Sequence, residues 1–387
     1  MVNKTYRFRI YPTAEQEILL AKHFGCTRYV YNHFLNERKK QYQANKKSDN
    51  YYKQAATLTK LKKEEDTKWL KEVNSQTLQF ALRSLDTAFL NFFRGNAQFP
   101  KFKSKKRKNT FTIPQFGKLE DGKIIIPKFK DGIKVKLHRE VKGKIGKMSI
   151  TKTPTGKYFV SILCETGEDT LPKLKTDKET TVGIDLGIKS FIVSSDGMEY
   201  GNPKFLRKAE SKLRYTQRKY SKYKGKRTKQ KLAILHEKVT NRRKDFLHKV
   251  SSELIKNHDS LAIETLQVSN MLKNHKLAKS ISDAGWDMFV TMLEYKANWY
   301  GKNILKIGTF EPSSKTCSCC GAINKDLQLK DREWTCGSCG TLLNRDVNAA
   351  INIKNFALKN KVSGTDTKNQ NELPTLVGVL TSEAPGL

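Results

Sequence analysis

The sequence predicts an α+β protein of several domains, and three observations lead to this prediction. Helical patterns run from residue 13 to residue 93, and short strands separated by turns follow from about 111 to 165. Apolar strands then alternate with long basic helices. Two Cys-x-x-Cys pairs interrupt this last region. At about 100–200 residues per domain, the 387 residues are enough for about two to four domains.

The charge balance points to a polyanionic partner. The chain carries 74 Lys+Arg against 38 Asp+Glu, a formal net charge of +36. A charge of this size opposes compaction by self-repulsion, and a bound polyanion offsets it. Nucleic acid is therefore the leading candidate. An anionic membrane is second, but neither end of the sequence carries a dominant basic amphipathic helix.

Hydropathy excludes two other classes of protein. The 37% hydrophobic content is too high for a wholly disordered chain. The sequence has no apolar run of about 18 residues that would span a bilayer. Its N-terminus, MVNKTYRFRI, lacks the apolar stretch of a signal peptide. We therefore expect a cytoplasmic protein without a membrane partner.

The first elements are a strand and a helix. Tyr6, Phe8 and Ile10 alternate with arginines, which predicts a strand. Thr13-x-x-Gln16 has the form of a capping box, in which two side chains satisfy free backbone N–H groups. A helix is therefore expected to begin directly after Thr13.

The stretch 74–93 carries the clearest helical pattern. Ser75 is its expected N-cap, and Gly95 is the expected stop. Beyond it, six of the eight residues from Lys101 to Lys108 are basic. The apolar residues of the helix recur at spacings of three and four, namely Leu78, Leu82, Leu85, Phe89 and Phe92.

Residues 111–165 have the pattern of an all-β segment. Turn signals recur about every 8–12 residues, which favours a small barrel or sandwich. The N-terminal strand can join this sheet, and residues 13–106 would then be a helical insertion into a β domain. The expected strands lie in FTIPQF, GKIIIP, GIKVKL, KMSITKT and KYFVSILCE.

The second half opens with a polar linker at 170–180 and contains a strongly basic region. Between Pro203 and Val250 there are 18 Lys/Arg and 3 acidic residues, with a sparse apolar stripe. This pattern predicts one or two long basic helices.

The cysteines give the most specific signal in the sequence. Cys317-x-x-Cys320 and Cys336-x-x-Cys339 are separated by 15 residues, and a glycine follows each pair. Two such turns can place four thiolates around one Zn²⁺ in a zinc ribbon. Because all four positions are cysteine, we expect a structural ion with no catalytic role. Cys319 is an alternative to Cys320, whose spacing matches the second pair.

Three carboxylates form the second candidate site. Asp185 lies within the apolar run Val-Gly-Ile-Asp-Leu-Gly-Ile, where an acid is costly unless it is paired or binds metal. Glu264 ends another apolar strand, and Asp346 begins a helix, where N-capping is the simpler role. Two strand-borne acids and a third on a helix can hold two Mg²⁺ for phosphodiester hydrolysis.

These segments resemble, in order and spacing, the TnpB family of RNA-guided DNA nucleases, which are encoded by IS200/IS605 transposons and related to Cas12 effectors. The resemblance extends from about residue 4 to residue 356. One departure is Asn344, where many members of the family carry aspartate. The segments that carry the resemblance are GIDLGIKSF, IETL, the two CxxCG pairs and RDVNAAINI.

The resemblance implies an RNase H-like RuvC nuclease domain with an inserted zinc ribbon. It also implies a β-barrel wedge domain that carries a helical recognition lobe. The catalytic, Mg²⁺-binding acids would be Asp185, Glu264 and Asp346. The implied boundaries are 1–12 (wedge), 13–106 (recognition lobe), 107–175 (wedge barrel), 176–316 (RuvC), 317–340 (target nucleic-acid-binding ribbon), 341–361 (last RuvC helix) and 362–387 (disordered tail).

The resemblance also implies the partners. A guide RNA from the transposon end would pair with one DNA strand, and the protein would recognise a short motif beside the target in duplex DNA. One monomeric chain in a prokaryotic, nucleoid-associated complex would suffice. A guided repressor without cleavage is the alternative, although the three acids are present. A junction resolvase or a DDE transposase uses similar acids but would leave the ribbon unexplained.

Nucleic-acid contacts are predicted on three segments, and for the first and third a solvated helix face is the simpler interpretation. Amides and hydroxyls in the helical lobe could read base edges: Tyr52, Gln76 and Gln79. A basic run could hold phosphates: Lys101, Lys103, Lys105, Lys106 and Arg107. The basic helices offer a second phosphate set: Arg242, Arg243 and Lys244.

Overall fold

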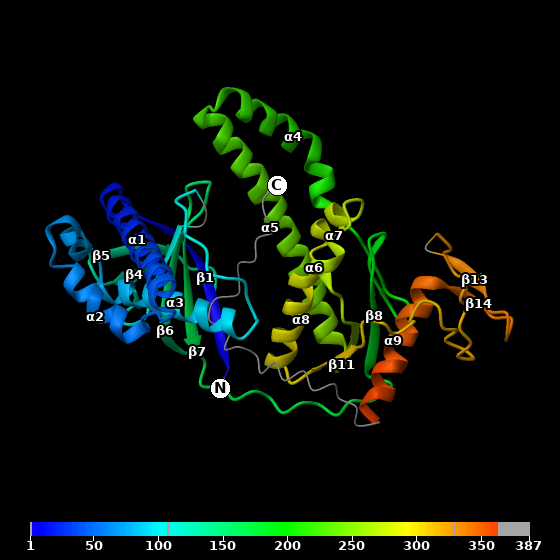
Figure 1. The fold of residues 1–387 in the computed structure, drawn as a ribbon. Helices are drawn as coiled ribbons and strands as arrows, with labels where there is room; N and C mark the ends of the chain where they lie inside the picture. The colour runs from blue at the N-terminus through cyan, green and yellow to red at the C-terminus, as the bar shows by residue number, and fades with distance from the viewer. Residues whose placement is uncertain (1, 107–108, 329, 363–387) are drawn as a thin grey trace. The chain divides into compact units, whose positions relative to one another are not determined.

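A computed structural model describes residues 2–106, 109–328 and 330–362, and the chain divides into two compact units, 1–169 and 170–387. Figure 1 shows the elements of each unit. The predictions for Arg107 and for a disordered tail beyond residue 362 lie outside the described residues.

The first unit is built on a seven-stranded antiparallel sheet in the order β2-β6-β7-β1-β5-β4-β3. The N-terminal strand pairs with β7 on one side and β5 on the other, so it joins the later strands as predicted. The described pairings run in a line from β2 to β3, and closure into a barrel stays a prediction. The strands are β1 (Asn3–Tyr11), β2 (Asn109–Ile113), β3 (Lys118–Glu120), β4 (Lys123–Ile126), β5 (Phe129–Lys136), β6 (Lys144–Lys152) and β7 (Tyr158–Glu165).

Helices occupy the span between β1 and β2. The predicted capping box is present, with Thr13 and Gln16 exchanging hydrogen bonds at the start of α1. The predicted N-cap of α3 was one residue off, because Asn74 accepts the Gln76 N–H and Ser75 is already helical. Leu20 and Phe24 of α1 pack into the core of the sheet. The helical elements are α1 (Ala14–Asn45), α2 (Tyr51–Leu61), the 3₁₀ helix η1 (Glu65–Glu72) and α3 (Ser75–Phe93).

The second unit contains a five-stranded mixed sheet in the order β10-β9-β8-β11-β12. Strands β8, β11 and β12 are mutually parallel, and β9 and β10 are antiparallel additions. The strands are β8 (Thr181–Leu186), β9 (Ser190–Ser194), β10 (Glu199–Gly201), β11 (Ser260–Glu264) and β12 (Asn303–Ile307), with a small hairpin of β13 (Glu333–Thr335) and β14 (Leu342–Asn344). The helices are α4 (Phe205–Tyr223), α5 (Lys226–Asn257), α6 (Val268–Met271), α7 (Ala278–Ala284), α8 (Trp286–Trp299) and α9 (Arg345–Val362).

Helices cover both faces of this sheet, as Figure 1 shows for α5 and α8 on one side of β8 and α9 on the other. Val182, Ile184 and Ile263 belong to the core with α5 and α8. Because side chains alternate along a strand, residues 183, 185, 262 and 264 face the other way. Ala262 accordingly packs against α9. The face toward α9 therefore carries both strand-borne acids.

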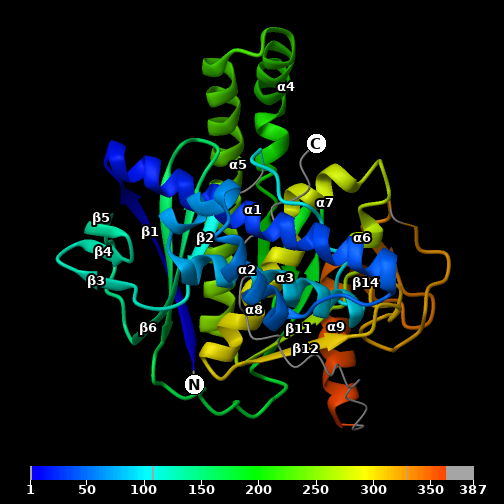
Figure 2. The same ribbon diagram turned by 60° about the vertical axis from the view of Figure 1, so that its left-hand side comes forward.

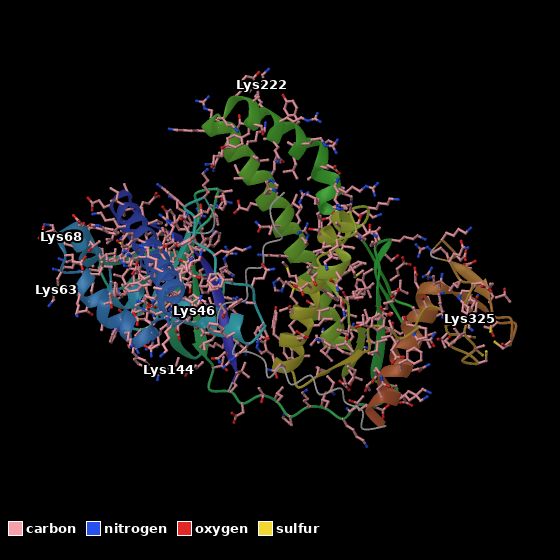
Figure 3. The ribbon with its side chains drawn as sticks, viewed as in Figure 1. Lys46, Lys63, Lys68, Lys144, Lys222 and Lys325 are labelled. Carbon is pink, nitrogen blue, oxygen red and sulfur yellow. The ribbon has the colours of Figure 1, made fainter. Side chains whose placement is uncertain are left out.

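The basic region folds into the hairpin of α4 and α5, which confirms the prediction of long basic helices. Figure 2 shows its two helices side by side, and Lys222 lies near its tip in Figure 3. Leu213 and Thr216 are the last buried residues of α4, and Val239 is the first of α5. The distal half of the hairpin thus exposes most of its basic surface. In the described part of the chain, no helix is long and apolar enough to cross a bilayer.

Gly183 is a position where α9 approaches the sheet too closely for a side chain. A Cβ at Gly183 would lie 2.0 Å from the carbonyl oxygen of Ala350 and 2.8 Å from the backbone nitrogen of Lys354. Both are backbone atoms of α9, so a side chain could be accommodated only by moving the helix.

We expect Gly183→Ala to lower the free energy of unfolding by about 1–3 kcal/mol or more, the cost of overpacking a closed interface. Gly201→Ala is the matched control, since a Cβ there meets nothing within 4 Å. Denaturant unfolding of both variants measures the difference. Equal stability of the two would show that α9 is not held this close to β8.

Candidate metal centre and acidic site

The four predicted cysteines converge on one point. The Sγ atoms of Cys317, Cys320, Cys336 and Cys339 all lie within 4.8 Å of one another. The pairs 317–339 and 320–336 are separated by 3.7 and 3.6 Å. A tetrahedral Zn²⁺ with Zn–S bonds of about 2.3 Å sets its sulfurs about 3.8 Å apart. The cluster therefore fits a tetrahedral zinc ion.

The remaining thiol of this segment stays outside the cluster. Cys319 is exposed and is not among the four grouped sulfurs, which confirms the choice of Cys320. Strands β13 and β14 form a hairpin whose turn contains the second cysteine pair. Trp334 and Leu343 pack with two of the ligands in a small apolar core. A core of this size is too small to hold a fold alone, so the metal would supply most of its stability.

Asp185 and Glu264 lie at the carboxyl ends of two neighbouring parallel strands. Ile184 of β8 pairs with Ile263 of β11, so the next residues, Asp185 and Glu264, follow side by side. Adjacent strands are about 4.8 Å apart. Both side chains are half-buried and face α9. Ser313 donates a hydrogen bond from Oγ to Glu264 Oε1.

Asp346 comes to the same place from the first turn of α9. The simpler interpretation, that Asp346 caps this helix, is wrong. Asn344 is the cap, because its Oδ1 accepts the N–H groups of Asp346 (3.1 Å) and Val347 (3.2 Å). Asn344 thereby leaves the Asp346 carboxylate available for another role. A carboxylate here is also favoured by the positive end of the helix dipole.

The charges show that the three acids share one environment. Burial, together with the negative charges of Glu264 and Asp346, raises the pKa of Asp185 to about 7. The positive charges of Arg345 and Arg332 oppose part of this rise. Among the described residues, the four cysteines are the only group of potential ligands within 4.8 Å of one another. The carboxylates are therefore neighbours in a more open arrangement.

Two arginines at this site were not found from the sequence. Arg332 Nη1 lies 3.3 Å from Asp346 Oδ1, and its carbonyl accepts the Arg345 N–H at 2.8 Å. Arg332 directly precedes β13, so the ribbon itself supplies a cation to the acidic site. In a chain with 74 Lys+Arg, no sequence signal distinguishes these two residues from the others.

A row of asparagines fixes the ribbon to α9. Asn344, Asn348 and Asn352 recur at spacings of four, which places them on one helix face. Asn348 accepts the Ser318 N–H and donates to the Thr316 carbonyl, at 2.9 and 2.7 Å. Asn352 donates to the carbonyls of Ser313 (2.8 Å) and Thr316 (2.6 Å). The sequence analysis missed this row, although its regular spacing within RDVNAAINIKN is visible.

The predicted phosphate contacts have different outcomes. Arg243 is ion-paired with buried Asp283 at 3.0 Å, and Asp283 also accepts the backbone N–H groups at the start of α4. The Arg243 side chain is only 13% exposed. We therefore withdraw Arg243 from the nucleic-acid candidates. Arg242 is exposed and Lys244 half-buried, and the role predicted for each stays a prediction.

The basic run after α3 is anchored on α1. Lys101, Lys103, Lys105 and Lys106 are exposed. Asn32 exchanges two hydrogen bonds with the backbone of Lys103, at 2.7 and 2.9 Å. Lys103 is therefore presented from a backbone that is held on α1.

The three residues predicted to read base edges lie on α2 and α3. Tyr52 is 78% exposed, and Gln79 is also exposed. Gln76 is half-buried, and its Nε2 lies 3.4 Å from Gln115 Oε1. Their base contacts stay predictions.

The chain matches three family models. Residues 161–275 match one described as "Probable transposase" (OrfB_IS605), and residues 286–353 match "Cas12f1-like, TNB domain". Residues 1–47 match one described as "Helix-turn-helix domain". In this structure that segment holds β1 and the single long helix α1.

Similar proteins cover nearly the whole chain. A Streptomyces pristinaespiralis protein named "Putative RNA-guided DNA endonuclease" is 38% identical over 381 residues, 96% of this chain and 93% of that protein. The Escherichia coli K12 protein "Putative RNA-guided DNA endonuclease InsQ" is 32% identical over 372 residues, 90% of this chain and 91% of its own.

A solved structure shares the fold. It is the cryo-EM structure of a Cas12f1–sgRNA–target DNA complex, with a TM-score of 0.53 and 15% identity over 91% of this chain and 98% of that one. The mixed α+β fold with its four-cysteine ribbon is therefore of the Cas12f1 type. The chain belongs to the TnpB/OrfB family of IS605 transposons.

Loss of one zinc ligand should abolish metal binding, whereas loss of the extra thiol should not. We expect the wild type and Cys319→Ser to retain one equivalent of zinc, measured by atomic absorption, and Cys336→Ser to lose it. Hydrogen exchange at residues 333–344 should rise only in Cys336→Ser. Loss of zinc in Cys319→Ser would contradict the assignment of the four ligands.

Neutralising Asp185 should stabilise the protein at alkaline pH when no Mg²⁺ is present. Folding raises its pKa from 3.8 to about 7, so between these values the folded state retains a proton that the unfolded state releases. The folded state is penalised increasingly as pH rises through this window, and fully above it. In the zinc-loaded protein without added Mg²⁺, Asp185→Asn should be more stable than the wild type by about 1–3 kcal/mol above pH ~7.

The stabilising effect of Asp185→Asn should disappear toward pH 4, and Asp287→Asn, at an exposed position of α8, should show no such effect. Thermal unfolding across the pH range measures it. An effect independent of pH would contradict the raised pKa of Asp185.

Proposed function

We propose that this protein is an RNA-guided DNA endonuclease that cuts through a single metal-dependent site. The observation that carries the proposal is the convergence of Asp185, Glu264 and Asp346 from β8, β11 and α9 at one end of a sheet. The relatives that are similar over more than 90% of their length carry the name of this activity.

The three carboxylates suit a pair of Mg²⁺ ions. They are hard oxygen donors, which Mg²⁺ prefers. Burial, together with the charges of the other two acids, raises the pKa of Asp185, and a bound cation relieves both costs. When bound, two such ions would supply charge stabilisation for the attacking and leaving oxygens of a phosphodiester.

The chain's own residues hold and orient this site. Asp185 and Glu264 are fixed by strand register, and Ser313 orients Glu264 through its hydroxyl. Asp346 is fixed by the Asn344 cap and by Arg332. Arg332, which lies beside Asp346, would also be placed to pair with a phosphate oxygen of the substrate, since its guanidinium is a bidentate donor.

We assign the domains as the family resemblance suggests. The second unit would be an RNase H-like RuvC domain, and the ribbon would contact target DNA. The first unit would be the wedge and recognition lobe, its sheet closing as a barrel. A guide RNA and target DNA would offset the +36 charge. We further propose a monomeric protein in a cytoplasmic complex.

Cleavage should depend on the acids and not on acids elsewhere. The protein is expressed with the DNA that flanks its gene, copurified RNA is sequenced, and a plasmid library with a randomised motif is digested in Mg²⁺. We expect a defined RNA and depletion of plasmids that carry one motif. Asp185→Ala and Asp346→Ala should each slow cleavage at least about 100-fold, the loss of several kcal/mol of transition-state stabilisation.

Asp287→Ala is the matched control, because Asp287 is also an acid in a first helical turn, on α8. It should cut like the wild type. A defined RNA with no cleavage by the wild type would favour a guided repressor. The absence of any discrete RNA would overturn the proposal.

A further inference from the structure

One short loop, residues 308–312, is flanked on both sides by residues that contact Glu264. Ile307, the last residue of β12, pairs with Glu264 in the parallel register. Six residues later, Ser313 donates its hydroxyl to the Glu264 carboxylate. The intervening loop, residues 308–312, is therefore held at both ends beside the acidic site.

Phe310 lies at the centre of this loop and is 93% exposed. In the described part of the chain it is the most exposed large hydrophobic side chain. It lies in a turn that is closed by a hydrogen bond from the Glu311 N–H to the Gly308 carbonyl (3.5 Å). Ser313 N–H then bonds the Glu311 carbonyl at 2.8 Å. The turn thus presents the ring to solvent from a hydrogen-bonded backbone.

The distance from Phe310 to the site is bounded by the chain. Phe310 is three positions along the chain from Ile307 and three from Ser313, and three such steps span at most about 11 Å. Stacked nucleotides rise about 3.4 Å each. The ring is therefore within about three nucleotides of a phosphate held by the acids.

The chemistry of the surroundings selects a nucleic-acid strand as the ligand. An exposed aromatic ring binds an unpaired base by stacking, and it does so with any base. Arg332 and Arg345 lie at the acidic site, so cations for a phosphate backbone accompany the ring. A guide selects its target by base pairing, so a contact near the cutting site must tolerate every sequence.

We propose that Phe310 stacks on an unpaired base of the DNA strand next to the scissile phosphate and positions that strand for cutting. This inference rests on the proposed function and adds a substrate subsite to it. Phe310 is a positioning residue, because it contacts a neighbouring nucleotide and not the reacting atoms.

Photocrosslinking tests the contact directly. The protein, copurified with its RNA, is mixed without added Mg²⁺ with single-stranded oligo(dT) that carries 5-iodouracil, and irradiated. We expect an adduct on the peptide that contains Phe310, retained in Phe310→Trp and lost in Phe310→Leu, which keeps an apolar side chain without a π face. Tyr300→Ala, an exposed aromatic at the opposite end of β12, should not change the adduct. An adduct pattern unchanged in Phe310→Leu would overturn the inference.

Cleavage kinetics give the second test. Loss of one stacked base should raise the KM for target DNA about tenfold in Phe310→Leu, with Phe310→Trp near the wild type and all thermal transitions unchanged. If the wild type cuts and Phe310→Leu cuts with the same KM and kcat, only the stacking inference fails. If the wild type cuts no DNA, the proposed function fails, and the crosslink still decides the contact at Phe310.

Discussion

The site depends on the close packing of α9 against β8. Only glycine fits at position 183, because α9 backbone atoms occupy the space of a side chain. This contact brings the first turn of α9 to the carboxyl ends of β8 and β11. Without it, Asp346 would not share the environment of Asp185 and Glu264. A packing constraint thus brings together acids that are 161 positions apart in the sequence, Asp185 and Asp346.

The three acids repel one another, and the surrounding residues offset this repulsion. Ser313 donates to Glu264, Arg332 pairs with Asp346, and the charge of Arg345 lowers the cost at Asp185. Arg332 belongs to the ribbon segment, and Asn344 joins the ribbon's last strand to α9. The zinc ribbon therefore acts on the acidic site through two direct contacts.

Much of this arrangement could be predicted from the sequence. The cysteine spacing gave the four ligands, the apolar strands gave Asp185 and Glu264, and the capping box gave the start of α1. Local patterns carry these features, since each depends on residues close in sequence. The TnpB resemblance, which the whole-chain relatives confirm, linked them to one activity.

Features that depend on contacts between distant residues were missed. Arg243 has a side chain suited to binding phosphate, but in the folded protein it forms an ion pair with buried Asp283. The sequence position of Asp346 predicts a helix cap, but Asn344 caps the helix in the structure. The ion pair of Arg332 with Asp346 joins residues 14 positions apart. The exposure of Phe310 depends on how the loop 308–312 folds. No local sequence pattern predicts either feature.

The most direct test of the account is whether the three acids bind metal as one site. Mn²⁺, a paramagnetic substitute for Mg²⁺, can be titrated into the protein and its free form measured by electron paramagnetic resonance. The account predicts that Glu264→Gln on β11 and Asp346→Asn on α9 each weaken the same high-affinity binding. Unchanged Mn²⁺ binding in Asp346→Asn would contradict it, because α9 would then not contribute to the site.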